Sequence, residues 1–311
     1  SCQYAHFLQY GLCLREREEY GFEKVDMGNV THEVLQNFGE ELLQKKIEWN
    51  QMEEEAMNEA VDRIVDVISA SYGSGILQGS AQNRYYTTRI RRILKRTVKT
   101  LGEQLRPGRF VPYDYEHTFR KLYEDKFLLK GKVDRIDLCR QDDEIFVKII
   151  DYKTGLKDFD YSKLYYGTVL QLAVYMKETL EHLKVLHPEA ELSPGAMLYY
   201  RIMDPKIKSN VSLSEEESEA RFLKELNYKG LVNARAGIVD AMDSDFEKNS
   251  LVIPVQKGKD AEIKETDKVV NTEIFEAVLS YASWKAISLA KDVKEGKISC
   301  NPAVVSGDDP C

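Results

Sequence analysis

The fold is decided by residues 130–155, which read KGKVDRIDLCRQDDEIFVKIIDYKTG. Two β-like runs, at 128–139 and 145–152, flank a polar stretch at 140–144. Apolar and β-branched runs on either side of a short polar segment are typical of two antiparallel strands and their turn. The stretch therefore predicts a β-hairpin.

Charged residues on this hairpin form a candidate site. Asp151 and Lys153 are two apart, so they are expected on one face of the second strand. Asp134, near the middle of the first strand, can lie opposite Asp151. Two carboxylates beside a lysine suit a divalent cation and the anion that it binds. The alternative is an ordinary surface ion pair, which would contribute little; we favour the site because Asp and Lys are depleted from strands.

Length and composition indicate one large α/β domain or two smaller ones. The chain has 311 residues, of which 43% are hydrophobic and 31% charged, an ordinary balance for a soluble protein. No apolar run reaches membrane-spanning length and no signal peptide precedes Ser1, so we expect a cytoplasmic protein with no membrane partner. The net charge of −8 argues against general binding to nucleic acid, although local basic patches can still bind phosphates.

The cysteines do not fit a secreted disulfide framework, because there are five in a long chain. Cys139 and Cys300 are most simply small hydrophobic residues. Cys2 and Cys311 stand at the two ends. A chain that begins and stops beside a cysteine is expected to be a fragment of a longer protein.

Residues 28–49 predict an amphipathic helix, because Leu35, Phe38 and Leu42 recur at helical spacing. His32 lies in the first turn of this helix, beside the apolar stripe. A lone histidine in such a place is more often structural than a ligand. That expectation changes if this end of the helix meets the hairpin.

A basic segment at 84–99 follows an acidic one. It contains seven Lys and Arg residues and no Asp or Glu, and its apolar stripe predicts a helix with the cations on the other side. Contact with a phosphate backbone and a solvated helix face are equally consistent with this pattern. The acidic residues of the preceding helix, at 48–66, are expected to form a solvated face.

Strands expected at 110–119, 126–139, 145–152 and 196–203 make a mixed sheet of four or five strands. A long helix at 160–187 should cover this sheet, since it follows directly on a strand. In this helix Gln171 and Tyr175 share a face. They could reach the strand ends or be ordinary packing residues.

Other segments complete the expected order of elements. Residues 2–21 are dense in aromatics and predict a short helix docked on the core. Residues 213–243 read as helical in pieces, with breaks at Gly230 and Gly237. Residues 250–255 read as a short strand, and 272–295 as a last amphipathic helix.

Four motifs in order carry a resemblance to a known family. They are a helix with His32, G-x-x-D at 131–134, D-Y-K-T-G at 151–155 and Q-x-x-x-Y at 171–175. This series resembles the RecB-type nucleases of the PD-(D/E)XK superfamily. The opening CQYAHFLQYGLCLRERE and the segment RFLKELNYKGLVNARAGIVDAMD further resemble the C-terminal nuclease domain of the AddB family, the second component of bacterial AddAB helicase-nucleases.

The resemblance implies a restriction-endonuclease-like α/β core, in which helices flank a mixed central sheet and further helices are added at both ends. It implies one nuclease domain over 1–311. Its parts would be a helical region at 1–109, the catalytic sheet and helix at 110–204, and a helical region at 205–311.

The resemblance also implies roles for the site residues. The ligands of Mg²⁺, or of Mn²⁺, would be Asp134, Asp151, the carbonyl of Tyr152 and His32. Lys153 would position the attacking water or neutralise charge in the transition state. Gln171 and Tyr175 would hold the nucleophile, the scissile phosphate or the ligands.

A [4Fe-4S] cluster belongs to the same resemblance, with Cys2 and Cys311 at the first two ligand positions. Such a cluster uses four thiolates. The last two are absent from this chain, so the cluster is expected in the full-length protein and not in this fragment.

The implied function is metal-dependent cleavage of one unwound DNA strand by an exonuclease, during processing of double-strand breaks for recombinational repair. The implied partners are double-stranded DNA ends, the unwound single strand and the AddA helicase-nuclease. ATP would be used by the complex, but this chain has no G-x-x-x-x-G-K-[ST] motif to bind it. The alternatives are a catalytically silent DNA-binding or scaffolding module and a stand-alone exonuclease.

Overall fold

The computed structural model, which describes residues 3–14, 24–73, 77, 79–123, 127–205 and 214–299, contains the predicted hairpin. Strands β2 (Phe127–Gln141) and β3 (Glu144–Lys153) pair antiparallel from Gln141–Glu144 to Arg135–Ile150. Asp142 in the two-residue turn has a φ of 53°, the left-handed conformation that Asp tolerates and that tight hairpin turns require.

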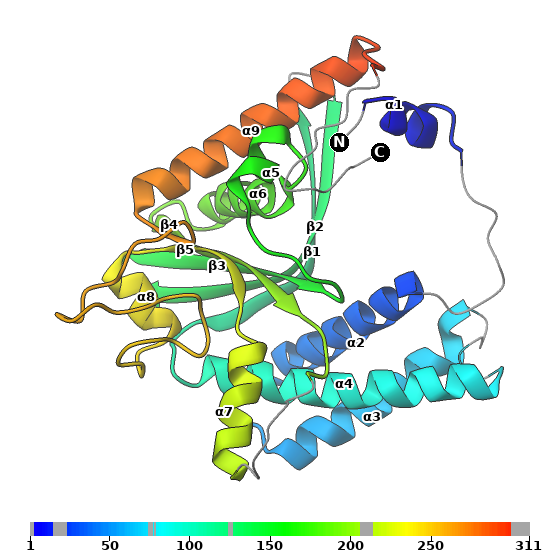
Figure 1. Ribbon diagram of the computed structural model, residues 1–311, viewed down its shortest axis with the longest axis vertical. Coiled ribbons are helices and arrows are strands. Elements are labelled where there is room, and N and C mark those ends of the chain that lie inside the picture. The colour runs from blue at the N-terminus through cyan, green and yellow to red at the C-terminus, as the bar shows by residue number, and fades with distance from the viewer. Residues whose placement is uncertain are drawn as a thin grey trace.

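The hairpin belongs to a mixed sheet of six described strands (Figure 1). In spatial order the other strands are β1 (Val111–Tyr123) on one side, and β4 (Glu191–Arg201), β5 (Lys229–Asn233) and β6 (Val269–Val270) on the other. β3 pairs with β4, and β5 with β6, in parallel. The remaining neighbours are antiparallel. Both β3 and β4 therefore end at the same edge of the sheet, where β5 begins.

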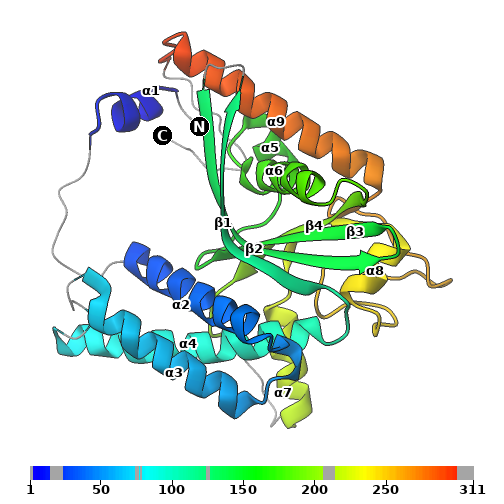
Figure 2. The ribbon, with the colours of Figure 1, turned by 180° about the vertical axis from the view of Figure 1, so that it is seen from behind.

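Helices cover both faces of this sheet (Figures 1 and 2). One core packs the sheet against α2 (Lys24–Lys45), α3 (Glu54–Ser71), α4 (Ala81–Leu105) and α8 (Ala236–Met242). The other packs it against α5 (Tyr161–Tyr166), α6 (Gln171–Leu186) and α9 (Thr272–Lys294). A mixed sheet between two helical layers confirms the predicted α/β class. Short elements α1 (Gln3–His6), η1 (Phe7–Gly11) and η2 (Trp49–Gln51), and helix α7 (Glu215–Glu225), complete the order.

Several predicted elements were wrong in type or extent. The described sheet has six strands, one more than the upper end of the predicted four or five: β5 forms in a segment read as helix, and β6 in residues to which no element was assigned. Gly230 is not a helix break but a β5 residue with a φ of 139°, and a Cβ there would lie 2.2 Å from the carbonyl oxygen of Met197 on β4. Residues 250–255 form no strand, and the predicted helix at 160–187 is two helices. They are divided at Gly167, which has a φ of 78°.

The basic segment of α4 lies against the acidic segment of α3, and three of its seven cations pair with α3 in the described structure. Arg91 contacts Asp62 at 3.0 Å and Asp66 at 2.6 Å, and Lys95 contacts Asp62 at 2.7 Å. Lys99 pairs with Glu54 of α3 and also with Glu219. Two further cations of α4 pair with carboxylates on other elements: Arg92 with Asp204 and Arg96 with Glu219. Asp62 and Glu54 are thus not simply solvated, and most cations of α4 already have protein partners.

No helix among the described residues combines the length and apolar character needed to cross a membrane. The first short helix, α1, has no buried residues, and neither has η1. The described residues 3–14 therefore do not show the predicted docking of this aromatic segment on the core.

An ion trio is buried beneath the sheet, on the side of α2 and α4. Arg135 donates to both oxygens of Asp137, at 2.6 and 2.8 Å, and Lys148 lies 3.0 Å from the same carboxylate. The side chains are at most 5% exposed, and Trp49 packs against the guanidinium. Burial alone would raise the pKa of Asp137, but the two cations outweigh it and hold this pKa below its ordinary value.

Removing the Asp137 carboxylate should destabilise the fold strongly. Asp137→Ala leaves two cations buried without their counter-ion, which costs on the order of 3–5 kcal/mol. Urea unfolding followed by circular dichroism measures the loss. Asp240→Ala, on the exposed face of α8, is the control and should change the free energy of unfolding by less than about 0.5 kcal/mol. Equal, small effects of both substitutions would contradict this account.

Candidate metal centre

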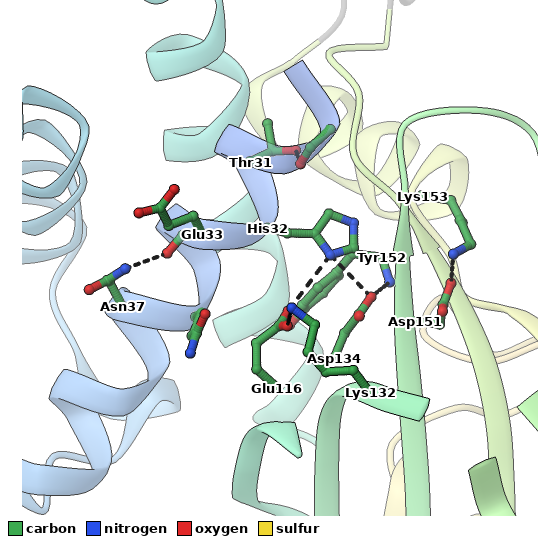
Figure 3. Close-up of polar contacts among 12 residues, drawn as sticks. Thr31, His32, Glu33, Asn37, Glu116, Lys132, Asp134, Asp151, Tyr152 and Lys153 are labelled. Carbon is green, nitrogen blue, oxygen red and sulfur yellow. Dashed lines mark hydrogen bonds and ion pairs between the residues drawn. The ribbon is translucent and has the colours of Figure 1, made fainter. Parts of the chain in front are cut away.

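The site begins where β2 and β3 separate. Their ladder ends at the Arg135–Ile150 pair. Beyond it the backbone N–H of Tyr152 donates to Oδ2 of Asp134 at 2.7 Å (Figure 3). A side-chain carboxylate thus takes the position of a main-chain partner, and Asp134 is held, almost buried, between the diverging strands.

His32 reaches this point from α2. Its Nδ1 lies 3.4 Å from Oδ2 of Asp134 and 3.8 Å from Oε1 of Glu116 (Figure 3). α2 can approach the sheet this closely because Gly39 faces Tyr115 of β1, and a Cβ on Gly39 would lie 2.2 Å from the Tyr115 ring. The predicted place of His32 in the first turn was wrong, because α2 begins at Lys24, eight residues earlier. The side of the helix that carries His32 nevertheless meets the hairpin, so His32 is a candidate ligand.

Glu116 of β1 is a site residue that the sequence reasoning missed. It is buried directly after the buried Tyr115, which breaks the in–out alternation of a strand. A φ of 52° at Glu116 makes this possible, at a cost of about 1–3 kcal/mol for a non-glycine residue. An available signal was that Glu, like Asp and Lys, is depleted from strands.

His32, Glu116 and Asp134 converge like the ligands of one cation. Their ligand atoms all lie within 4.8 Å of one another. A cation that takes bonds of about 2.0–2.6 Å can touch all three. Glu116 also forms an ion pair with Lys132 of β2, so its charge is partly balanced by the protein itself.

Asp151 lies outside this group of three, one residue before Tyr152 on β3. It is 1% exposed, and its Oδ2 lies 2.5 Å from Nζ of Lys153 (Figure 3). Both carboxylate oxygens are buried without a well-directed hydrogen-bond donor. Burial and the nearby Asp134 raise the pKa of Asp151 to about 6, against the opposing effect of Lys153.

These residues fit a divalent cation. A buried carboxylate whose oxygens accept no hydrogen bond is costly unless another group satisfies it. Asp151 is in that state beside the three converging potential ligands. Two or three carboxylates with one imidazole suit Mg²⁺ or Mn²⁺. The sequence predicted two of the three converging potential ligands, His32 and Asp134, and the structure adds Glu116.

Gln171 and Tyr175 lie at the start of α6, farther from the acids. The Gln171 amide donates to the Tyr175 hydroxyl at 3.3 Å, and that hydroxyl accepts from the Lys132 backbone N–H at 3.4 Å. Tyr175 packs over Gly131, where a Cβ would lie 2.7 Å from its ring. These contacts connect the two residues to each other and to β2.

The proposed cluster cysteines, Cys2 and Cys311, lie outside the described residues. In the part of the chain that the structure describes, Cys13 and Cys139 are free. Cys139 is buried, as expected for a small hydrophobic residue.

Comparison with known proteins gives a consistent result. Residues 1–267 match the PD-(D/E)XK nuclease superfamily. The chain is similar to proteins named as the B subunit of an ATP-dependent helicase/deoxyribonuclease. The identity is 37% over 321 residues for the protein of Lachnoclostridium phytofermentans and 31% over 322 residues for that of Alkaliphilus oremlandii, each covering 100% of this chain. It is 34% over 314 residues, or 97% of this chain, for Clostridium perfringens. The chain spans only 27–28% of the length of these relatives.

His32 should carry a proton at neutral pH in the metal-free protein. Burial lowers its pKa, but Asp134 and Glu116 outweigh burial and raise this pKa from 6.5 to about 9. The folded-state pKa lies above the unfolded one, so the stabilisation is complete below pH 6.5 and is lost as pH rises towards 9. NMR titration of the imidazole in EDTA should give a midpoint near 9. A midpoint near 6.5 would show that the two acids do not hold the charged form.

Proposed function

The chain belongs to the PD-(D/E)XK nuclease superfamily, and we propose that it hydrolyses phosphodiester bonds of DNA at the site around Asp134, with Mg²⁺ or Mn²⁺ as cofactor. The observation that supports this most directly is the convergence of His32, Glu116 and Asp134 beside Asp151 and Lys153. Three potential ligands, a further carboxylate and a cation, brought together by α2 and strands β1–β3, match the needs of phosphoryl chemistry.

In this proposal the converging residues of α2, β1 and β2 hold the cation, and Asp151 completes their set from β3. When bound, a divalent cation supplies charge stabilisation at the phosphoryl oxygens and lowers the pKa of a water. The raised pKa of Asp151 reflects first its burial and then the negative charge of Asp134; a cation bound nearby would favour the charged carboxylate. The carbonyl of Tyr152 is proposed as a further ligand by family resemblance.

Lys153 is proposed to act on the phosphate. Its side chain is 25% exposed while its partner Asp151 is 2% exposed, so the ammonium stands between the buried acid and the open space beyond β3. From there it can neutralise a phosphoryl oxygen or orient the attacking water. An ammonium must lose its proton before it can act as a base, so we assign it the first two roles.

Gln171 and Tyr175 are proposed to position the site. The Tyr175 hydroxyl accepts from the Lys132 N–H, and Lys132 pairs with Glu116. Loss of this hydroxyl would act on the ligand Glu116 through β2. It would not remove a ligand directly.

The relatives' names support a role within a larger assembly. They name the B subunit of an ATP-dependent helicase/deoxyribonuclease, and the chain corresponds to about a quarter of the length of these relatives. We propose that it is the nuclease part of such a protein and cuts one strand unwound from a double-stranded end. An AddA partner would supply translocation. Cys2 and Cys311 are proposed as two ligands of a [4Fe-4S] cluster in the full-length protein.

Lys153→Ala should reduce Mg²⁺-dependent cleavage of a labelled single-stranded oligonucleotide by about 10²-fold or more, because one preorganised charge at the phosphate is lost. Lys177→Ala, a partly exposed lysine on α6, is the matched control and should cleave at the wild-type rate. An unchanged rate for folded Lys153→Ala would remove the role assigned to this residue. A wild-type chain that binds metal but does not cleave would favour the silent scaffolding module.

Glu116→Gln should weaken Mn²⁺ binding on the order of 10-fold or more, because the neutral amide keeps the shape but not the charge of the carboxylate. Isothermal titration calorimetry measures the affinity. Glu189→Gln, on an exposed loop, is the control for the loss of one negative charge. Equal affinities for the two variants would exclude Glu116 as a ligand.

A further inference from the structure

A second feature lies beside Lys153, at the edge of the sheet where β3 and β4 end and β5 begins. A pocket of about 310 Å³ opens there. Five of its lining residues are basic, Lys153, Lys157, Arg201, Lys224 and Lys229, and one, Glu225, is acidic. Such an excess of positive charge stands out in a chain of net charge −8.

Strand register places three of these cations on the face that carries Asp151. Lys153 of β3 is paired with Arg201 of β4, and Tyr199 of β4 with Lys229 of β5. Directly paired residues point to the same side, as do residues two apart on one strand. Neighbouring strands lie about 4.8 Å apart. The cations therefore form a row that starts at the proposed catalytic lysine and leads away from it.

These pocket cations differ from those of α4 in how they are paired with acidic side chains. Within the described ranges, no acidic side chain pairs with Lys157, Arg201, Lys224 or Lys229, whereas the α4 cations are largely matched. Nε of Arg201 is buried without any partner. A buried donor without a partner is unfavourable, and a bound anion would satisfy it.

We propose that this pocket binds the phosphodiester backbone of the DNA strand immediately next to the bond that is cut, with Arg201 and Lys229 as its main phosphate contacts. The inference rests on the proposed nuclease function, because Lys153 is common to both sites. A guanidinium suits phosphate through two parallel hydrogen bonds. Tyr199 is the single aromatic residue of the lining, so the pocket suits backbone phosphates better than stacked bases.

The test is the salt dependence of DNA binding by the 311-residue chain in EDTA, where cleavage is suppressed. Fluorescence anisotropy of labelled oligo(dT) gives the affinity between about 50 and 200 mM salt, and each single-strand phosphate contact contributes about 0.7 to the log–log slope. Lys229→Gln should make the log–log slope less steep by about 0.7, and the double variant Arg201→Gln with Lys229→Gln by about twice that amount. Lys229 is exposed, so its single variant should keep the fold even if Arg201→Gln does not.

The matched control is Lys248→Gln with Lys259→Gln, which removes two exposed charges from outside the pocket and should leave the slope unchanged. Pocket variants with the wild-type slope, or a control that shifts as much as they do, would overturn the inference. A shift seen only with a 5′-phosphorylated oligonucleotide would also overturn it, in favour of a terminal-phosphate pocket. Failure of the nuclease proposal is read separately, from the wild-type chain's cleavage with Mg²⁺.

Discussion

The hydrogen bond from the Tyr152 N–H to the Asp134 carboxylate is the interaction on which the site depends. A buried backbone donor must find a partner, and where β2 leaves β3 that partner is a side chain. The strands can then separate without an unsatisfied amide. Because a side chain takes the place of a main-chain acceptor here, the Asp134 carboxylate lies in the interior, where its charge must be balanced. His32 provides the balance in the metal-free protein, and Glu116 is drawn to the same imidazole.

The sequence predicted the parts of this arrangement that follow from period and spacing. The β2–β3 hairpin, the common face of Asp151 and Lys153, and the helix carrying His32 are all local patterns. Glu116 was not accessible in the same way, because its burial requires a left-handed residue inside a strand, which alternation does not reveal. β5 was missed because Gly230 reads as a helix break, while its real role is to admit the Met197 carbonyl. Tertiary contact decided both cases.

Charge is used in three ways in this acidic chain. The trio at Asp137 is buried, and its carboxylate is already bound by two cations, so it contributes to the fold and offers no acid to a ligand. The ion pairs between α3 and α4 are partly exposed. The sequence shows the run of cations on α4 but not the acids that face them in the fold. At the ends of β3 and β4, Lys153 pairs with Asp151, whereas Arg201 and the nearby Lys157, Lys224 and Lys229 have no acidic partner among the described residues. A local excess of this kind can attract an anion although the whole molecule is acidic.

The separation of β2 from β3 has one further consequence. Residues 127–134 of β2 pair with β1 alone in the described part of the sheet, so the far side of this strand is an edge. Exposed edges invite pairing with the strand of another molecule, and lysines and covering elements are common protections. Lys130 and Lys132 lie on this stretch, and Tyr175 of α6 occupies the Lys132 amide. Tyr175 therefore covers one backbone donor of this edge, which would otherwise be open to pairing with another strand.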